Sequence, residues 1–391
     1  MPEMNLHSGY WDFPVPIYYG PGSIRLLPKL VLQHGINRPL LVSDEATARL
    51  PIVQAIVAQL QAATIEVTSH NDFSANPTDE ECHTGAKRLL EAGCDGIIAV
   101  GGGSSMDAAK AIGLIANQKQ VTLWDFDTEV PPPDARSLAP FVPLVCVPTT
   151  SGTGAETEGT AMVVNTHNFE KRCIYHLDYH PIFALLDAEL TLGLPRNLTS
   201  WTGIDAIVHA IEAYLVPGFH PLCDGAALQS LRLTAMALPK VVNNGHDLSA
   251  RNDMQIGACL AGVAFKKGLG MVHAISHMVG GLYNTQHGLT NAVLLPAVLR
   301  FNESHMGNKA VELARACGAD SDDFEGLYAW VITQLEALDI PNGLAALGVQ
   351  SGDVERLASM AMNDGGMPTN PRPVSLAECQ LFIADAMAKT W

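Results

Sequence analysis

The sequence predicts an α/β N-terminal domain with a mostly parallel sheet, followed by an all-helical C-terminal domain. The chain has 391 residues, whereas a single hydrophobic core stops growing at about 250–300 residues. Short apolar runs alternate with helical stretches in the first half, and long helical stretches with few strand signals fill the second half. Such alternation is typical of parallel strands covered by helices.

The first half of the chain contains the predicted strands. Each strand is a short apolar run, and each helix has apolar residues at a spacing of three and four. The helix at 77–93 opens with Pro, Thr, Asp and further acids, a composition typical of a helix start. The predicted strands lie in 38–44, 64–69, 95–104 and 143–156, of which the last two end in turns, and the predicted helices are 50–63, 77–93 and 105–117.

The second half is predicted to be helical, with the first helices at 202–215, 224–242 and 252–265 and further ones up to Trp391. Gly and Pro interrupt the pattern in "LTLGLPRNLTS" (190–200), and such interruptions mark connections between elements. The sequence therefore predicts an α/β domain over residues 1–190 and a helical domain over residues 191–391.

Composition excludes several classes of partner. The net charge of −17 argues against nucleic acid and anionic membranes, because binding their phosphates requires clustered Lys and Arg. The eight cysteines are scattered, with no Cys-x-x-Cys, which is typical of reduced thiols in the cytosol. The start, "MPEMNLHSGYWDF", lacks a secretion signal, and no apolar run of 18 residues exists. We expect a cytoplasmic protein with no membrane or nucleic-acid partner.

Two glycine-containing turns predict an anion site. A strand runs into the Gly101–Ser104 turn, and a helix follows. Glycines let the backbone approach an oxygen closely, and the N–H groups at the helix start are unpaired. The turn "PTTSGTG" (148–154) offers further donors at the end of another strand. The alternative is a pair of tight turns with nothing bound, but together they favour a dinucleotide in the crevice of an open sheet.

Asp44 ends an earlier predicted strand. A carboxylate there can accept hydrogen bonds from both ribose hydroxyls and repel a 2′-phosphate, which favours NAD over NADP. In the common fingerprint the acid follows the glycines by about 20 residues, whereas Asp44 precedes them by more than 50. The alternative is an ordinary turn or helix-cap residue.

Five polar residues on apolar segments predict a metal site. Asp205 and His209 lie four apart, and so do His273 and His277, so each pair shares a helix face. His287 follows a loop or broken helix, "MVGGLYNTQ". Burying such groups unpaired is costly, so they bind either a metal or each other and distant cations. Carboxylate and imidazole donors suit Fe(II), Zn(II), Co(II) or Ni(II), and spacing alone favours the pair His273 and His277.

These motifs resemble those of the iron-containing (group III) alcohol dehydrogenase family over almost the whole chain. The resemblance implies the dehydroquinate synthase-like fold of iron-dependent alcohol dehydrogenases, with a dinucleotide-binding N-terminal domain and a metal-binding, catalytic C-terminal domain. It rests on "FPVPIYYGPGSI" (13–24), "NPT" (76–78), "GGGSSMDAAKAI", "PTTSGTGAE", "DAELTLGLP" (187–195), "GIDAIVHAIEAY", "HAISHMVGGLYNTQHGLTNAVLLP" (273–296) and "NPRPV" (370–374).

The resemblance changes the choice of metal ligands. It implies that Asp205, His209, His273 and His287 bind the metal. It also implies that His277 is the family's non-ligand histidine, near the substrate and the nicotinamide.

The resemblance further implies a set of cofactor contacts. Lys171, ten residues before Pro181, matches a lysine that reaches the cofactor ribose, but "KRCIYHLDYHPIF" (171–183) is atypical and Arg172 is an alternative. Ala155 and Gln286 stand where many members have Ser and Pro. The implied contacts are Asp44, Asn76, Gly101, Gly102, Gly103, Ser104, Asp107, Thr149, Thr150, Thr153, Lys171, Leu190 and Gly193.

The implied activity is hydride transfer between NAD(H) and a small alcohol or aldehyde. Fe(II), or Zn(II) or another divalent metal, acts as a Lewis acid on the substrate oxygen, and His277 or the ribose hydroxyls relay the proton. Small alkanols, 1,3-propanediol, lactaldehyde and 4-hydroxybutyrate are candidate substrates. The alternatives are a maleylacetate reductase-like or glycerol dehydrogenase-like enzyme and a non-enzymatic binding protein. The family usually forms homodimers or larger assemblies, which is the expectation here.

Overall fold

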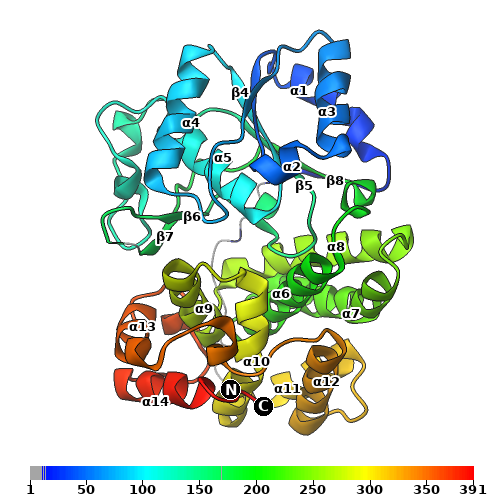
Figure 1. The fold of residues 1–391 in the computed structure, drawn as a ribbon, viewed down its shortest axis with the longest axis vertical. Helices are drawn as coiled ribbons and strands as arrows, with labels where there is room; N and C mark the ends of the chain where they lie inside the picture. Colours follow the sequence, from blue (N-terminus) through cyan, green and yellow to red (C-terminus); the bar gives the residue numbers. More distant parts are fainter. Residues whose placement is uncertain (1–10, 12, 14, 169) are drawn as a thin grey trace, which may run out of the picture.

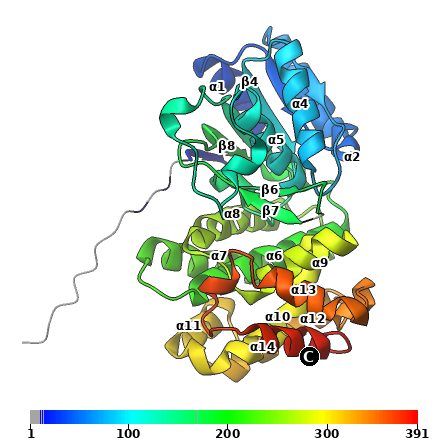
Figure 2. The ribbon, with the colours of Figure 1, turned by 90° about the vertical axis from the view of Figure 1, so that its left-hand side faces the viewer.

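The chain folds into an α/β part and a helical part that lie one above the other (Figures 1 and 2). The structure is a computed structural model, and it describes residues 11, 13, 15–168 and 170–391. Most of the N-terminal stretch that we searched for a secretion signal therefore lies outside the described residues.

The α/β part is built on a six-stranded sheet in which every described pairing is parallel. The register pairs Val42 with Ala99 and Gly101 with Pro148, so neighbouring strands end at the same edge of the sheet. The strands, in their spatial order, are β1 (Ile17–Tyr19), β8 (Phe183–Leu186), β5 (Leu144–Pro148), β4 (Gly96–Gly101), β2 (Pro39–Val42) and β3 (Thr68–His70).

Helices cover both faces of this sheet, as its apolar strands require. Along β4, Ile97 and Ala99 pack toward one face, while Ile98 and Val100 pack toward the other. Helices α4 (Asp79–Glu91) and α5 (Gly103–Ile115) contribute to the first apolar layer, and α1 (Leu27–Gln33) and α3 (Pro51–Ala62) contribute to the second.

The predicted strand at 64–69 is wrong in its first half. Thr64 has a φ of 66°, and the N–H of Ile65 donates to the carbonyl of Leu60 at the end of α3. The first residues of the segment therefore close the helix, and the strand begins only at Thr68.

Several short strands had no prediction because three or four residues are too few for a periodic pattern. They are β1 and β8 of the main sheet and an antiparallel pair, β6 (Ala161–Val164) and β7 (Lys171–Ile174). Helix α5 also starts two residues earlier than predicted, because Gly102 is extended and Gly103 is already helical.

The helical part begins at Arg196, directly after Pro195. Its described residues form no strand. The α-helices are α6 (Arg196–Leu215), α7 (Pro221–Asn243), α8 (Leu248–Ala264), α9 (Met271–Tyr283), α10 (His287–Met306), α11 (Asn308–Cys317), α12 (Phe324–Ala337), α13 (Val354–Ala361) and α14 (Leu376–Ala386). The predicted fold class is therefore confirmed, whereas the boundary at residue 190 stays a prediction.

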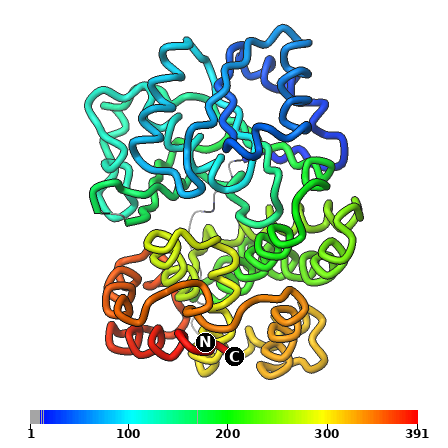
Figure 3. The backbone as a smooth tube through the Cα atoms, viewed as in Figure 1, coloured from blue at the N-terminus to red at the C-terminus, as the bar shows by residue number. Residues whose placement is uncertain are grey.

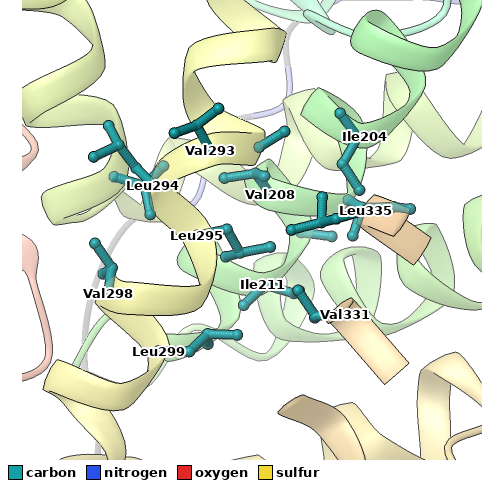
Figure 4. Close-up of a cluster of buried hydrophobic side chains, with 14 of the residues drawn as sticks. Ile204, Val208, Ile211, Val293, Leu294, Leu295, Val298, Leu299, Val331 and Leu335 are labelled. Atoms are coloured by element: carbon teal, nitrogen blue, oxygen red, sulfur yellow. The ribbon is translucent and has the colours of Figure 1, made fainter. Parts of the chain in front are cut away.

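Helix α6 is the central element of the helical part. Its residues Ile204, Val208 and Ile211 belong to the buried apolar cluster, and Figure 4 shows them beside apolar side chains of α10 and α12. Asp205 directly follows Ile204, His209 directly follows Val208, and both polar residues are also buried. Helix α6 therefore carries polar groups into the interior, and its apolar side anchors them.

The two parts touch where α8 packs on the turn after β5. A Cβ atom added to Gly262 would lie 2.4 Å from the carbonyl oxygen of Gly154 and 2.5 Å from the hydroxyl oxygen of Thr157. Only glycine allows the helix to approach the turn this closely. Among the described residues no single helix is long and apolar enough to cross a membrane, although one pair bent by 104°, 248–267 with 271–283, passes a test of length and composition.

We expect Gly262→Ala to destabilise the protein by about 1–3 kcal/mol, because the added methyl group overpacks this contact. The measurement is the midpoint of thermal unfolding. The matched control is Gly225→Ala in α7, where an added Cβ meets nothing within 4 Å, so that better helix propensity should leave stability unchanged or raise it by about 0.5–1 kcal/mol. Equal losses in both variants would refute the close-packing explanation.

Candidate metal and cofactor site

The two glycine-containing turns lie against each other at the carboxyl ends of β4 and β5. A Cβ atom on Gly103 would lie 2.9 Å from Thr153, and one on Gly102 would lie 3.3 Å from Thr150. Glycine therefore lets the start of α5 lie directly against the threonine turn, where a larger residue would collide. The structure thus brings together six predicted contacts, Gly101, Gly102, Gly103, Thr149, Thr150 and Thr153.

Asp44 lies beside the glycine turn although it is distant in sequence. An added Cβ on Gly101 would lie 3.7 Å from the Oδ2 atom of Asp44. The Oδ1 atom of Asp44 also accepts from the N–H of Thr47 at 3.0 Å, which caps the short helix α2 (Glu45–Ala48). Both interpretations of Asp44 are therefore compatible: it caps a helix, and its second oxygen is close to the glycine turn.

Lys171 and Arg172 have different partners. The Nζ atom of Lys171 donates to the Oδ1 atom of Asn76 at 2.9 Å. Arg172 instead forms ion pairs with Asp127 at 2.8 Å and with Glu129. Since carboxylates already hold the guanidinium, Lys171 is the better candidate of the two for a cofactor contact.

Ser104 and Asp107 lie on the first turns of α5. The hydroxyl of Ser104 donates to the carbonyl of Ala75, so α5 holds the loop that carries Asn76. Burial raises the pKa of Asp107 to about 6, and the positive charges of Lys110 and Lys171 oppose this rise. Burial likewise lowers the pKa of Lys171, against the opposing charges of Asp107 and Asp205.

Leu190 and Gly193 are placed less decisively. Leu190 is buried in the same apolar layer as α1 and α3, while Gly193 is exposed, with no atom within 4 Å of an added Cβ. Their cofactor contacts stay predictions.

Four predicted ligands converge in the helical part. Asp205, His209, His273 and His287 each offer one ligand atom, and these four atoms all lie within 4.8 Å of one another. Asp205 and His209 come from α6 and His273 from α9, and all three are buried. This group contains His287 and does not contain His277. It is the set that the family resemblance implies, whereas residue spacing alone favours His273 with His277.

The break between α9 and α10 explains this selection. Helix α9 ends at Tyr283, and Asn284 takes a left-handed conformation with a φ of 51°. Gln286 then caps α10 through its side chain, which accepts from the N–H of Leu289 at 2.6 Å. His287 is the first residue of the new helix. Gln286 thus caps the helix at a position where many members of the family that the sequence resembles have Pro.

The cluster has the properties of a cation site. Burial lowers the pKa of His273 and of His287 well below the ordinary value, and neighbouring histidines lower both further. Both rings are therefore neutral near pH 7, the form in which a histidine nitrogen can bind a metal. The Nδ1 atom of His209 is buried and has no hydrogen-bond partner within the described chain. An oxygen and three imidazole nitrogens fit a divalent transition metal.

Glu212 supports His273, and we did not predict this role from the sequence. Its Oε2 atom lies 2.5 Å from the Nδ1 atom of His273, and Oε1 accepts from the N–H of Val272 at 2.8 Å. A carboxylate in this position would accept the Nδ1 proton and leave Nε2 as the atom that could bind a metal. Burial raises the pKa of Glu212 to about 7, against backbone N–H donors. The signal was present, since Glu212 follows His209 by three residues on the same helix.

Asn291 was also missed. Its Nδ2 atom lies 2.7 Å from the Oδ1 atom of Asp205 and 3.1 Å from the Nε2 atoms of both His273 and His287. Asn291 follows His287 by four residues on α10, so the helical spacing was again a usable signal. The amide holds three of the four ligand side chains together.

His277 lies next to the cluster with a partner of its own. Its Nδ1 atom is 2.8 Å from the Oδ2 atom of Asp364, and its ring stacks on that of His287 at 5.3 Å between centroids. Burial raises the pKa of Asp364, but the interaction with His277 and the N–H of Gly366 outweigh it, so that the pKa is lowered. Asp364 is 87 residues away in sequence, and no local pattern predicts the pair.

Two family models match the chain. The model described as iron-containing alcohol dehydrogenase matches residues 14–188, and the model for the C-terminal region of the Fe-containing alcohol dehydrogenase family matches residues 199–387. Together they span nearly the whole sequence.

Named relatives show the same similarity. The chain is 34% identical to an NAD-dependent methanol dehydrogenase of Bacillus methanolicus over 94% of the chain and 97% of the relative. It is 35% identical to a 4-hydroxybutyrate dehydrogenase of Cupriavidus necator over 94% and 96%. Among solved structures, a 1,3-propanediol oxidoreductase superposes with a TM-score of 0.90 at 32% identity and covers 97% of this chain and 100% of that one.

We expect Glu212→Gln to weaken metal binding by about 10–100-fold, because the loss of a partner that orients a ligand histidine typically has this effect. The measurement is the Zn²⁺ dissociation constant in competition with a chelator. Glu303→Gln is the control, since Glu303 is an exposed residue of α10. Unchanged affinity in the Glu212 variant would contradict the role assigned to this carboxylate.

Proposed function

Because the chain belongs to the iron-containing alcohol dehydrogenase family and is an NAD-dependent oxidoreductase of alcohols and aldehydes, we propose that Asp205, His209, His273 and His287 hold its divalent metal. The observation that carries the proposal is the convergence of these four ligand atoms within 4.8 Å. The family favours Fe(II), and the same donors also accept Zn(II). A metal bound there supplies Lewis acidity toward the substrate oxygen.

The α/β part binds the cofactor in this proposal. The free N–H groups at the start of α5 and the hydroxyls of Thr149, Thr150 and Thr153 surround the pyrophosphate. Asp44 accepts hydrogen bonds from the adenosine ribose and repels a 2′-phosphate, so that NAD is preferred over NADP.

His277 handles the proton in this proposal. Asp364 accepts from its Nδ1 atom at 2.8 Å, which orients the ring and leaves Nε2 for exchange with the substrate or the ribose. Because the ring stacks on that of the ligand His287, it lies near the reacting atoms without being part of the ligand group.

The substrate class follows from the relatives. Their names include methanol, 4-hydroxybutyrate and 1,3-propanediol as substrates, and we propose that this chain acts on a small primary alcohol and its aldehyde. A specialised 4-hydroxybutyrate, 1,3-propanediol or lactaldehyde oxidoreductase and a maleylacetate reductase-like enzyme are the alternatives. We further propose a homodimer or larger assembly in the cytoplasm, which agrees with eight free cysteines.

The test of the proposed function combines metal content with activity. Anaerobically purified protein should contain about one metal ion per chain and oxidise NADH with one or more aldehydes of a panel that covers the substrates above. Asp205→Ala should lose the metal and the activity together. His277→Ala should keep the metal while kcat falls by roughly 10²–10⁴-fold, the range of general acid–base catalysis.

The control for these variants is His246→Ala, a change to an exposed histidine of the helical part, which should alter neither quantity. Loss of the metal from the His277 variant would make His277 a ligand and overturn the assignment. A protein that lacks both metal and activity across the panel would refute the proposed function.

We expect Asp44→Ser to relax cofactor preference. Serine preserves the helix cap that Asp44 provides to α2 and removes the charge that repels a 2′-phosphate. The ratio of kcat/KM for NADPH to that for NADH should rise by about tenfold, equivalent to about 1.4 kcal/mol. Asp247→Ser, at the cap of α8, is the matched control. If NADPH is still rejected to the same degree, another group sets the preference.

A further inference from the structure

An asparagine in the break between α9 and α10 reaches across to the α/β part. The Oδ1 atom of Asn284 accepts from the Nδ2 atom of Asn76 at 2.7 Å. The segment around Asn284 lies at the edge of the helical part nearest the α/β part (Figure 3). This hydrogen bond is a contact between the two parts in addition to the packing of Gly154 on Gly262 and the hydrogen bond from Gln255 to the carbonyl of Pro148.

The bond belongs to a chain of three side chains. The Oδ1 atom of Asn76 accepts from the Nζ atom of Lys171 at 2.9 Å, while its Nδ2 atom donates to Asn284. Both ends of the Asn76 amide are therefore engaged inside the protein. Because the amide has a distinct donor and acceptor, each neighbour fixes its orientation for the other.

This series of hydrogen-bonded side chains lies beside the predicted cofactor turn in the α/β part and beside a predicted metal ligand in the helical part. On the α/β side, Ser104 of the glycine turn holds the carbonyl of Ala75, the residue before Asn76. On the helical side, Asn284 precedes the ligand His287 by three residues, and its left-handed backbone ends α9. The chain of hydrogen bonds thus connects the predicted pyrophosphate turn to the segment that places a metal ligand.

Lys171, the third member of these hydrogen-bonded side chains, lines a pocket to which both parts contribute. A pocket between β7 and the helices α9 and α13 has Lys171 and Cys173 on one wall and Met278 and Asp364 on the other. Lys171 therefore links the Asn76–Asn284 hydrogen bond to a pocket between the α/β part and the helical part.

We propose that Asn284 is a positioning residue that couples dinucleotide binding in the α/β part to metal binding in the helical part. The inference rests on the proposed function, because it requires both ligands. A cofactor in the crevice orders the Asn76 loop, and a metal on His287 orders the break after α9. The Asn76–Asn284 hydrogen bond is best formed when both segments are ordered, so each ligand strengthens the binding of the other.

Two substitutions separate the side chain of Asn284 from its backbone. Asn284→Gly keeps the left-handed conformation, which glycine adopts freely, and removes the acceptor oxygen. Asn284→Asp keeps an oxygen in the same position and also tolerates the left-handed region. Both variants can therefore adopt the left-handed backbone between α9 and α10, but only Asn284→Asp can still accept the hydrogen bond from Asn76.

The experiment measures NADH binding to the full chain by fluorescence, first after chelation and then after loading with Zn²⁺. The ratio of the two dissociation constants is the coupling factor. Because Asn284 is exposed to water and its bond is neutral, we expect Zn²⁺ to tighten NADH binding by about three- to tenfold in the wild type. Asn284→Gly should lower this factor to about one at unchanged Zn²⁺ stoichiometry, and Asn284→Asp should retain it.

The proposal is overturned if Asn284→Gly keeps the wild-type coupling factor, or if Asn284→Asp loses it as fully as the glycine variant. It is also overturned if wild-type protein that has bound Zn²⁺ has the same NADH affinity as the chelated protein. Failure of the proposed function looks different, because the wild type would then bind neither Zn²⁺ nor NADH.

Discussion

The burial of Asp205, His209 and His273 among apolar helices, with the half-buried His287 beside them, is the constraint on which the centre of the helical part depends. Removing such groups from water is costly unless each polar atom has a partner. Glu212 and Asn291 satisfy some of these atoms, but the Nδ1 atom of His209 stays unpartnered within the described chain. In the proposed function a divalent cation would complete the set, and the core of α6, α9 and α10 would then be built around a ligand as well as around its own apolar contacts.

In the α/β part, several predicted cofactor-binding segments follow strands that end at the same edge of the sheet. Because β2, β4 and β5 run parallel and in register, Asp44, the glycine turn and the threonine turn meet at one end of the sheet. The packing of α8 on the second turn then places this edge against the helical part. Hydride transfer requires cofactor and substrate to be close, and this arrangement brings the two proposed half-sites to the same interface.

Much of this site was predictable from the sequence, for reasons that residue spacing makes clear. Asp205 and His209 are four residues apart, so they share a face of their helix whatever the tertiary structure. Two glycine turns after apolar runs indicate an anion site. Spacing could not choose between His277 and His287, because the position of His287 depends on where α9 ends. Helix α9 ends directly before the left-handed residue Asn284, and residue spacing does not predict this end. Nor could spacing pair His277 with Asp364, since only the packing of α13 beside α9 brings them together.

The most direct test of the central claim is a crystal structure of the metal-loaded protein, with anomalous diffraction collected at the absorption edge of the metal. The account predicts one peak about 2.0–2.2 Å from an oxygen of Asp205 and from one nitrogen each of His209, His273 and His287. His277 should lie beyond bonding distance and keep its contact with Asp364. A peak coordinated by His273 and His277, with His287 turned away, would contradict the account.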